Sequence, residues 1–358
     1  MIQKIKKALY FTIIALIFNI FAINNTMVNP AFAYTESKAE YVLEVNSNKV
    51  FKAVNEDLKL PIASTTKIVT AITVINNFDV NKIVTVPKNC ANVEGSSIYL
   101  REGEKISVLD LLYGLMLRSG NDCAETLAST LTTRENFIKL MNKTAKELGA
   151  TNTNLVNPHG LHDNEHYSTA KDLCLITKGA LENELFSKIV STKRQNISND
   201  GLEYDRVLIN KNKMLSFYEG CIGVKTGYTK KAGRCLVSSV KKDGFYVISV
   251  VINSPQMWER TQELYDDIFE NYTMREVFNS ENINNVVYTS ENGTNFKIES
   301  VGRLIYPIKN GTESSVKYKV NGVLFKDFIK NPSENGIFEI FNENELIFSQ
   351  NIFTILCK

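Results

Sequence analysis

Ser64 and Lys67 are the pair of residues in this sequence whose types and spacing point most directly to chemistry. Residues three positions apart on a helix lie side by side, one turn from each other. A serine hydroxyl is a weak nucleophile until a neighbouring base accepts its proton, and a desolvated lysine can be that base. The first turn of a helix also presents unpaired backbone N–H groups that suit a developing negative charge. The pair therefore predicts a nucleophilic serine activated by a lysine.

The spacing alone is weak, because it also occurs at Ser168, Ser238, Ser239 and Ser314. Only Ser64 opens a strongly apolar helical pattern, with Pro61 just ahead of it to end any preceding element. The apolar positions recur at i, i+3, i+4 and i+7, which predicts one buried helix face formed by Ile68, Ala71, Ile72 and Ile75.

Two further short motifs follow along the chain. Ser119-Gly120-Asn121 comes after a helical pattern that starts at a capping box, Ser107 and Asp110, and that we expect glycine to end. Lys225-Thr226-Gly227 occurs once, in a strand-like segment, where a glycine lets a ligand approach the backbone. Four other Ser-x-Asn matches exist, and a Lys-Thr-Gly segment can also be an ordinary strand end. Neither motif therefore identifies a site by itself.

The order of the three motifs resembles that of the penicillin-recognising serine acyl transferases, a general pattern known for β-lactamases and penicillin-binding proteins. The chain is similar to the low-molecular-mass penicillin-binding proteins that act as serine-type D-alanyl-D-alanine carboxypeptidases, peptidase family S11. The resemblance runs from about residue 34 to the end of the chain. Besides the motifs, it rests on the segments at 62–67, 95–100, 111–122, 157–161 and 224–229.

The resemblance implies catalytic roles for three residues. Ser64 attacks the carbonyl of the penultimate D-alanine of a peptidoglycan stem peptide and forms an acyl-enzyme. Lys67, neutral when it acts, accepts the serine proton, and Ser119 relays a proton to the leaving D-alanine. Asn121 holds the peptide backbone of the substrate. Water then releases the shortened peptide, whereas a β-lactam acylates the same serine and leaves slowly.

The resemblance also assigns the substrate-binding residues to the segment 225–228. Lys225 supplies positive charge for the terminal carboxylate of the substrate, and Thr226 donates a hydrogen bond to it. Gly227 has no side chain, which lets the ligand approach the backbone of the strand. The backbone N–H groups of Ser64 and Tyr228 form the oxyanion hole. The reaction requires neither a cofactor nor a metal.

Two alternatives remain open. A class A-like β-lactamase shares the motifs but usually has Ser-Asp-Asn and a glutamate that activates water. Here the second motif is Ser-Gly-Asn, and Glu165 is not followed by an asparagine four positions on. A non-catalytic penicillin-binding sensor is the other alternative, which a test for release of D-alanine distinguishes from an enzyme.

The elements expected around these motifs give an α/β (α+β) fold of the β-lactamase/transpeptidase-like kind. Strands are expected near the N-terminus and again later, with helices between them. An antiparallel sheet built from both ends of the domain, with helices on its faces, satisfies that order. The expected strands are 41–45, 49–53, 220–228, 235–240 and 245–252, and the expected helices include 137–148, 170–189 and 259–272.

After residue 278 short apolar runs alternate with Gly- and Asn-rich turns, which predicts a small all-β domain, a β-sandwich, over 278–358. The catalytic domain is then expected at 34–277. The last apolar runs, 346–348 and 352–357, are typical of strands rather than of the amphipathic membrane-binding helix with which the resembling family often ends. Peripheral membrane association is therefore left open.

Residues 1–33 have the pattern of a signal peptide, with three lysines, an apolar run and an Ala31-Phe32-Ala33 cleavage site. We expect an exported protein, at the cell wall, at the outer face of the membrane or secreted; an uncleaved anchor is the alternative. The net charge of +2 and the lack of a basic block beyond the N-terminus give no support to nucleic-acid binding.

The six cysteines are widely spaced without a Cys-x-x-Cys motif, which favours buried small hydrophobic residues over a disulfide scaffold or a metal site. Three histidines, His159, His162 and His166, lie close together in a polar segment. Because no carboxylate–histidine helix motif accompanies them, we expect a solvated loop rather than a metal centre.

Overall fold

The computed structural model describes residues 37–201, 204–284, 287–289, 293, 295–299, 302–322 and 336–356 of the 358-residue chain. The predicted signal peptide and Cys357 lie outside these residues.

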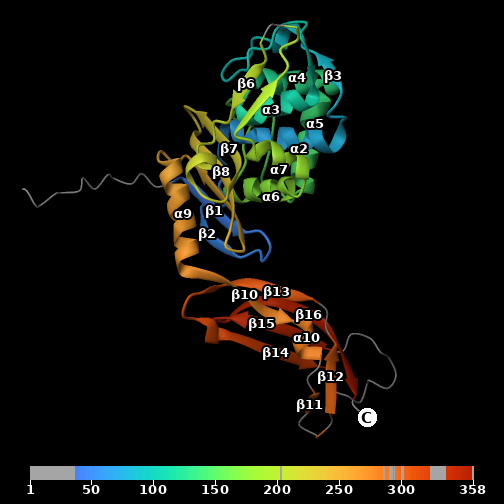
Figure 1. Ribbon diagram of the computed structural model, residues 1–358, viewed down its shortest axis with the longest axis vertical. Coiled ribbons are helices and arrows are strands. Elements are labelled where there is room, and N and C mark those ends of the chain that lie inside the picture. The colour runs from blue at the N-terminus through green and yellow to red at the C-terminus, as the bar shows by residue number, and fades with distance from the viewer. Residues whose placement is uncertain are drawn as a thin grey trace, which may run out of the picture. The chain divides into compact units, whose positions relative to one another are not determined.

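A five-stranded antiparallel sheet lies at the centre of residues 37–271 (Figure 1). Its strand order is β2-β1-β9-β8-β7, so strands from both ends of the region meet in one sheet, as the sequence predicts. The ladder of β1 against β9 pairs Ala39 with Ile252 at one end and Glu44 with Val247 at the other. The strands are β1 (Ala39–Glu44), β2 (Val50–Val54), β7 (Cys221–Thr229), β8 (Gly233–Lys242) and β9 (Phe245–Ile252).

Both faces of the sheet are covered, because successive side chains of a strand point to opposite faces. On β9, Val247 and Val251 pack with α9 (Met257–Asn271), whereas Ile248 and Val250 belong to the larger core formed with the other helices. Figure 1 shows α9 on one side of the sheet and α6 (Ala170–Leu181) and α7 (Glu184–Ser191) on the other. The sheet therefore separates two apolar cores, one on each of its faces.

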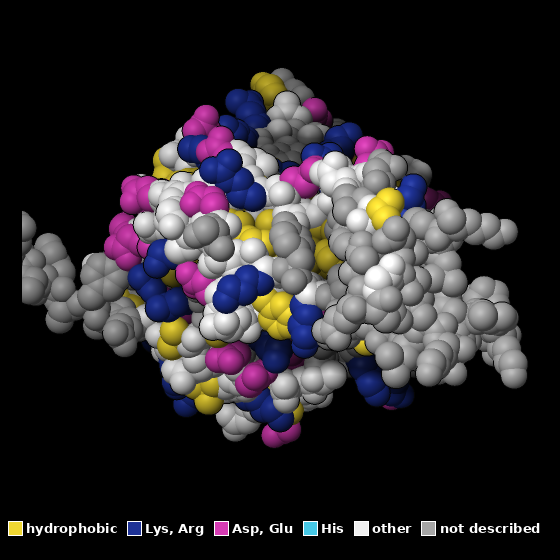
Figure 2. Space-filling model, turned by 90° about the horizontal axis from the view of Figure 1, so that it is seen from below, with side chains coloured by type: hydrophobic (Ala, Val, Ile, Leu, Met, Phe, Trp, Pro, Cys, Tyr) yellow, Lys and Arg dark blue, Asp and Glu magenta, His cyan; other side chains and the backbone are white. Residues whose placement is uncertain are grey.

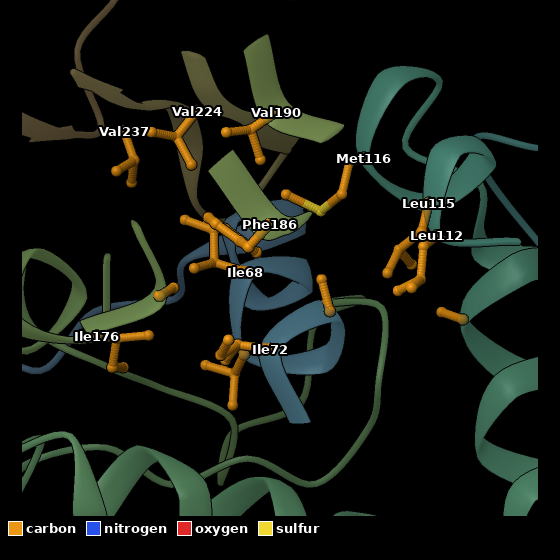
Figure 3. Close-up of a cluster of buried hydrophobic side chains, with 14 of the residues drawn as sticks. Ile68, Ile72, Leu112, Leu115, Met116, Ile176, Phe186, Val190, Val224 and Val237 are labelled. Carbon is orange, nitrogen blue, oxygen red and sulfur yellow. The ribbon is translucent and has the colours of Figure 1, made fainter. Parts of the chain in front are cut away.

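The helix that follows Ser64, α2 (Lys67–Asn77), is buried on more sides than its periodicity predicts. The expectation of a single buried face is wrong, since every residue from 67 to 74 is buried, Thr70 and Thr73 included. The reason is that α3, α5, α6 and α7 all contact α2. Figure 3 shows Ile68 and Ile72 of α2 among side chains of those neighbours and of the sheet, namely Leu112, Leu115, Met116, Ile176, Phe186, Val190, Val224 and Val237.

The remaining helices largely follow the sequence pattern. Ser107 caps α3, its Oγ accepting a hydrogen bond of 3.0 Å from the Asp110 N–H. The single helix expected over 170–189 is divided into α6 and α7. The reason is that Asn183 caps the N-terminus of α7, its Oδ1 accepting a hydrogen bond from the Phe186 N–H. These helices are α3 (Val108–Leu117), α4 (Asn121–Leu131), α5 (Arg134–Glu147) and α8 (Met214–Phe217).

Two small two-stranded sheets were not predicted by the pattern. They are β3 (Ile83–Thr85) with β4 (Lys105–Ser107), and β5 (Arg194–Ile197) with β6 (Arg206–Ile209). Their strands are only three or four residues long and have one buried residue each, so they are too short to show a periodic apolar pattern.

The C-terminal residues form mainly strands, as expected. A two-stranded sheet pairs β10 (Tyr272–Asn279) with β13 (Arg303–Lys309). A five-stranded sheet has the order β11-β12-β16-β15-β14. Its strands are β11 (Val287–Thr289), β12 (Asn295–Glu299), β14 (Val316–Gly322), β15 (Gly336–Asn342) and β16 (Glu345–Leu356), and a short helix α10 (Ser280–Asn284) follows β10. Because β10 runs across the expected boundary at 277/278, that domain boundary stays a prediction.

The cysteines agree with their expected role as small hydrophobic residues. All five described cysteines are free thiols; Cys90, Cys123, Cys174 and Cys235 are buried, and Cys221 is half-buried.

Among the described residues, none of the helices combines the length and the apolarity that crossing a membrane requires. On the face shown in Figure 2, basic and acidic side chains are intermixed.

Candidate active site

Ser64 lies in a 3₁₀ turn, η1 (Ala63–Thr66), that leads directly into α2. Ala63 has a left-handed backbone, with φ of +49°. Gly160 packs against this turn so closely that a Cβ there would lie 1.9 Å from the Ala63 carbonyl oxygen. The Thr66 hydroxyl donates a hydrogen bond of 2.9 Å to the same oxygen. The turn that carries Ser64, the Ser64 turn, is therefore held from the helix side and from the loop that contains Gly160.

Lys67 is fully buried and makes three hydrogen bonds through Nζ. These bonds reach Ser64 Oγ at 3.0 Å, Asn121 Oδ1 at 2.6 Å and the His159 carbonyl oxygen at 2.7 Å. Burial, followed by the nearby charge of Lys225, holds the pKa of Lys67 well below its usual value. A lowered pKa favours the neutral amine, which is the form able to accept the serine proton.

Ser119 and Asn121 come from the junction between α3 and α4. The helix α3 ends at Leu117, and it is Ser119, with φ of +64°, that takes the left-handed conformation expected of Gly120. This turn places Ser119 on the wall of the same cleft as Ser64. Asn121 is buried; its Oδ1 accepts from Lys67, and its Nδ2 donates to the Glu94 carbonyl oxygen at 2.5 Å. One hydrogen of this amide is left for another acceptor.

Strand β7 carries the motif Lys225-Thr226-Gly227 and brings it against the Ser64 turn. A Cβ on Gly227 would lie 3.1 Å from both the Ser64 nitrogen and the Ile62 oxygen, so glycine permits this approach. Thr226, Gly227 and Tyr228 line the cleft. Lys225 is buried, and its Nζ donates a hydrogen bond of 3.0 Å to the Thr226 carbonyl oxygen. Burial and the neighbouring Lys211 lower the pKa of Lys225 to about 7.

The cleft has a volume of about 500 Å³ and a basic character. Three of its lining side chains are cations and none is an acid, which suits an anionic ligand. Met257 and Trp258 add an apolar wall. The lining residues are Ser64, Ser96, Ser119, Lys211, Lys213, Thr226, Gly227, Tyr228, Arg234, Met257 and Trp258.

The expectation that the three histidines lie in a solvated loop is wrong for two of them. His159 and His166 are buried, and only His162 is exposed. His166 lies beside the Ser64 turn, with its Nε2 2.8 Å from the Thr66 hydroxyl. Its Nδ1 accepts a hydrogen bond of 3.1 Å from the Val156 N–H. Burial lowers the pKa of His166 to about 4. His166 therefore acts as a neutral structural group in this loop.

His159 is joined to a buried carboxylate that sequence reasoning missed. Its Nε2 lies 3.0 Å from Glu125 Oε1, and Arg134 holds both oxygens of the same carboxylate. Burial opposes the charge of Glu125, but the hydrogen bonds from His159 and Arg134 outweigh it and lower its pKa to about 2. Glu125 stands one helical turn after Asn121, a spacing visible in the sequence, yet its partners lie 9 and 34 positions away.

All eight candidate residues thus meet at one place. Ser64, Ser119 and the segment 226–228 line the cleft; Lys67 and Asn121 form a buried hydrogen-bonded pair beside the serine, and Lys225 lies buried on the strand that forms the cleft wall. Among the described residues, His, Cys, Asp and Glu side chains form no cluster able to hold a metal ion. The arrangement can deprotonate a serine and bind an anion beside it.

Comparison with known proteins gives the family of this chain. The family model of peptidase S11, described as D-alanyl-D-alanine carboxypeptidase, matches residues 24–256. The chain is 35% identical over 235 residues to D-alanyl-D-alanine carboxypeptidase DacF of Bacillus subtilis (strain 168). That match covers 64% of this chain and 60% of the relative, so the chain spans less than two thirds of DacF.

Two solved structures have the same fold. The D-alanyl-D-alanine carboxypeptidase DacD from Francisella tularensis superposes with a TM-score of 0.74 at 24% identity, over 92% of this chain and 95% of that one. The Streptomyces K15 DD-transpeptidase superposes with a TM-score of 0.61 at 31% identity, over 64% of this chain and 95% of that one. Because the family model matches residues 24–256, more than half of the chain, the chain belongs to the peptidase S11 family of D-alanyl-D-alanine carboxypeptidases.

Proposed function

We propose that this protein hydrolyses the terminal D-Ala-D-Ala bond of peptidoglycan pentapeptide stems through an acyl-enzyme on Ser64. One observation carries the proposal: a fully buried lysine amine, Lys67 Nζ, lies 3.0 Å from the hydroxyl oxygen of a serine that lines a basic cleft. Burial suppresses the charge of this amine and so makes it a base.

In the acylation step, Ser64 Oγ attacks the carbonyl carbon of the penultimate D-alanine while its proton passes to Lys67 Nζ. The carbonyl oxygen becomes an oxyanion, which accepts hydrogen bonds from the backbone N–H groups of Ser64 and Tyr228. The proximity of Gly227 to the Ser64 nitrogen supports this placement of the two donors.

The tetrahedral intermediate then collapses, and the C–N bond to the last D-alanine breaks. The proton taken from the serine returns to the leaving amine through Ser119, whose position on the cleft wall supports such a relay. A water molecule subsequently attacks the ester carbonyl and Lys67 accepts its proton; the bond between the acyl carbon and Ser64 Oγ then breaks as Lys67 passes the proton to Oγ, which regenerates Ser64 and releases the shortened peptide.

Recognition of the substrate rests on its terminal carboxylate. Lys225, in its protonated form, and the Thr226 hydroxyl bind this carboxylate, with Lys211 and Arg234 adding positive potential along the cleft. The free hydrogen of the Asn121 amide holds the peptide backbone. The resemblance implies these roles; Thr226, Lys211 and Arg234 line the cleft, whereas Lys225 and Asn121 are buried.

The same serine would be acylated by β-lactam antibiotics, which thereby act as covalent inhibitors. A class A-like β-lactamase is less well supported, because Glu165 is exposed and is not among the residues that line the cleft. A penicillin-binding sensor without turnover is the other alternative; every candidate catalytic position is filled here, so a loss of activity is not suggested.

The proposed location follows from the substrate. Peptidoglycan stems lie outside the cytoplasm, so we propose export directed by residues 1–33, a catalytic domain over 34–277 and a C-terminal β domain over 278–358. Residues 345–356 form the strand β16 rather than an amphipathic helix, and peripheral association with the membrane stays an open part of the proposal.

Release of D-alanine from a synthetic pentapeptide stem tests the proposal. We expect release by the wild-type chain and none by Ser64→Ala. Covalent penicillin binding without release of D-alanine would indicate a sensor, and rapid turnover of penicillin would indicate a β-lactamase.

A further inference from the structure

The direction in which Lys67 points depends on two acceptors besides Ser64. A neutral lysine amine has two hydrogens and one lone pair. When the hydrogens point to Asn121 Oδ1 at 2.6 Å and to the His159 carbonyl oxygen at 2.7 Å, the lone pair faces Ser64 Oγ at 3.0 Å. Displacing either acceptor therefore turns the lone pair away from the serine proton.

The His159 carbonyl belongs to a tight loop whose internal hydrogen bonds fix its shape. Asn157 Oδ1 accepts from the Gly160 N–H at 2.7 Å, and Asn157 Nδ2 donates to the Leu161 carbonyl at 2.9 Å. His159 Nδ1 accepts from the Leu161 N–H at 3.1 Å. This bond assigns the imidazole proton to Nε2, so the ring donates from Nε2 to Glu125 Oε1 at 3.0 Å.

Glu125 connects this loop to the helix that carries the other acceptor. Asn121 and Glu125 are one turn apart on α4, so one rigid element positions both acceptors of Lys67, the first directly and the second through His159. Arg134, at the start of α5, binds the Glu125 carboxylate through Nε at 2.9 Å and Nη2 at 3.0 Å. Both Glu125 and His159 are more than nine-tenths buried.

We propose that Glu125 is a positioning residue that orients the catalytic base, acting on Lys67 through the His159 loop; the inference rests on the proposed function. Glu125 touches neither the cleft nor Ser64. Its role is to keep the His159 carbonyl within hydrogen-bond distance of Lys67, so that the amine is directed toward Ser64 rather than toward another acceptor.

The test compares acylation by penicillin with release of D-alanine in Glu125→Ala, Glu125→Gln and His159→Ala. A misplacement of about 1 Å at a reacting group can reduce a rate by about 100-fold. For Glu125→Ala we expect acylation and kcat to fall between about 10-fold and 100-fold with KM nearly unchanged. Glu125→Gln still accepts from His159 Nε2 and should recover most of the rate.

A double variant and a surface control make the comparison specific. Because Glu125 and His159 act through one contact, the double variant Glu125→Ala/His159→Ala should lose no more than the worse single variant. Glu135→Gln removes an exposed carboxylate from the neighbouring helix α5 and should leave both rates unchanged.

Three results would overturn the inference: wild-type acylation by Glu125→Ala, a loss confined to KM, or losses that multiply in the double variant. If Glu125→Ala does not fold, His159→Ala and Glu125→Gln decide the question by the same criteria. Acylation also separates the two proposals. A wild-type chain that penicillin acylates but that releases no D-alanine contradicts the proposed function, while the variants still test the role of Glu125.

Discussion

The pH dependence of kcat/KM above neutrality depends on Lys225, because this buried amine has a pKa of about 7. Burial is the larger cause of the lowered pKa and the charge of Lys211 the smaller. In the proposed mechanism, only the protonated amine attracts the terminal carboxylate of the substrate. From the pKa, roughly 90% of the enzyme carries this proton at pH 6, roughly 10% at pH 8 and roughly 1% at pH 9.

We therefore expect kcat/KM for a peptide ending in D-Ala-D-Ala to fall about tenfold per pH unit above pH 8. At low pH the value also falls, because Lys67 must lose its proton to act as a base. The two lysines influence each other, so the two limbs of the profile belong to the pair. Binding of the carboxylate stabilises protonated Lys225, and kcat should therefore show a weaker alkaline limb than kcat/KM.

The assay measures D-alanine release from pH 5 to pH 9.5, together with hydrolysis of a matched thioester that lacks the terminal carboxylate. The thioester should retain the acid limb and lose the alkaline one. Lys211→Gln, which removes one of the charges that lower the pKa of Lys225, should move the alkaline limb to higher pH. A flat kcat/KM between pH 7 and pH 9 for the carboxylate substrate, or identical profiles for both substrates, would refute the reasoning.

Two further predictions concern stability. Gly160→Ala should lower the free energy of unfolding in urea by about 3 kcal/mol or more, since its Cβ would meet the Ala63 oxygen at 1.9 Å and its φ is +86°. Gly103→Ala, with φ of +80° and open space around it, is the matched control and should lose only about 1 to 2 kcal/mol; equal losses contradict the contact. His166 has its pKa lowered to about 4, so the unfolded chain binds more protons between pH 4 and 6.5. Stability should be fully present above pH 6.5 and fall by about 3 kcal/mol toward pH 4, and His166→Gln should reduce this dependence in urea titrations; an unchanged slope contradicts it.

The sequence predicts the sheet well because the pattern of each strand is a local signal. Apolar side chains of β9 point alternately into the two cores, and the apolar residues of α2 pack into the larger one. Both patterns can be read from neighbouring residues in the sequence. The left-handed conformation of Ser119 was not predictable, since a neighbouring glycine is the usual residue for it and the choice depends on how α3 and α4 pack.

The burial of His159 and His166 was missed for a related reason. Their loop is rich in polar residues, which ordinarily indicates exposure, but its polar groups are satisfied by partners distant in sequence such as Thr66 and Glu125. Long-range hydrogen bonds of this kind leave no periodic trace in the chain. The full burial of α2 likewise depends on helices that surround it, which a single amphipathic pattern does not reveal.

The central claim is that Ser64 is made nucleophilic by Lys67, and intact-protein mass spectrometry after treatment with penicillin tests it most directly. We expect one covalent adduct per chain, mapped by proteolysis to Ser64, and no adduct in Ser64→Ala. In Lys67→Met, which keeps the buried apolar stem without the amine, adduct formation should slow by at least about 100-fold. An adduct on any other residue, or unimpaired acylation of Lys67→Met, would contradict the account.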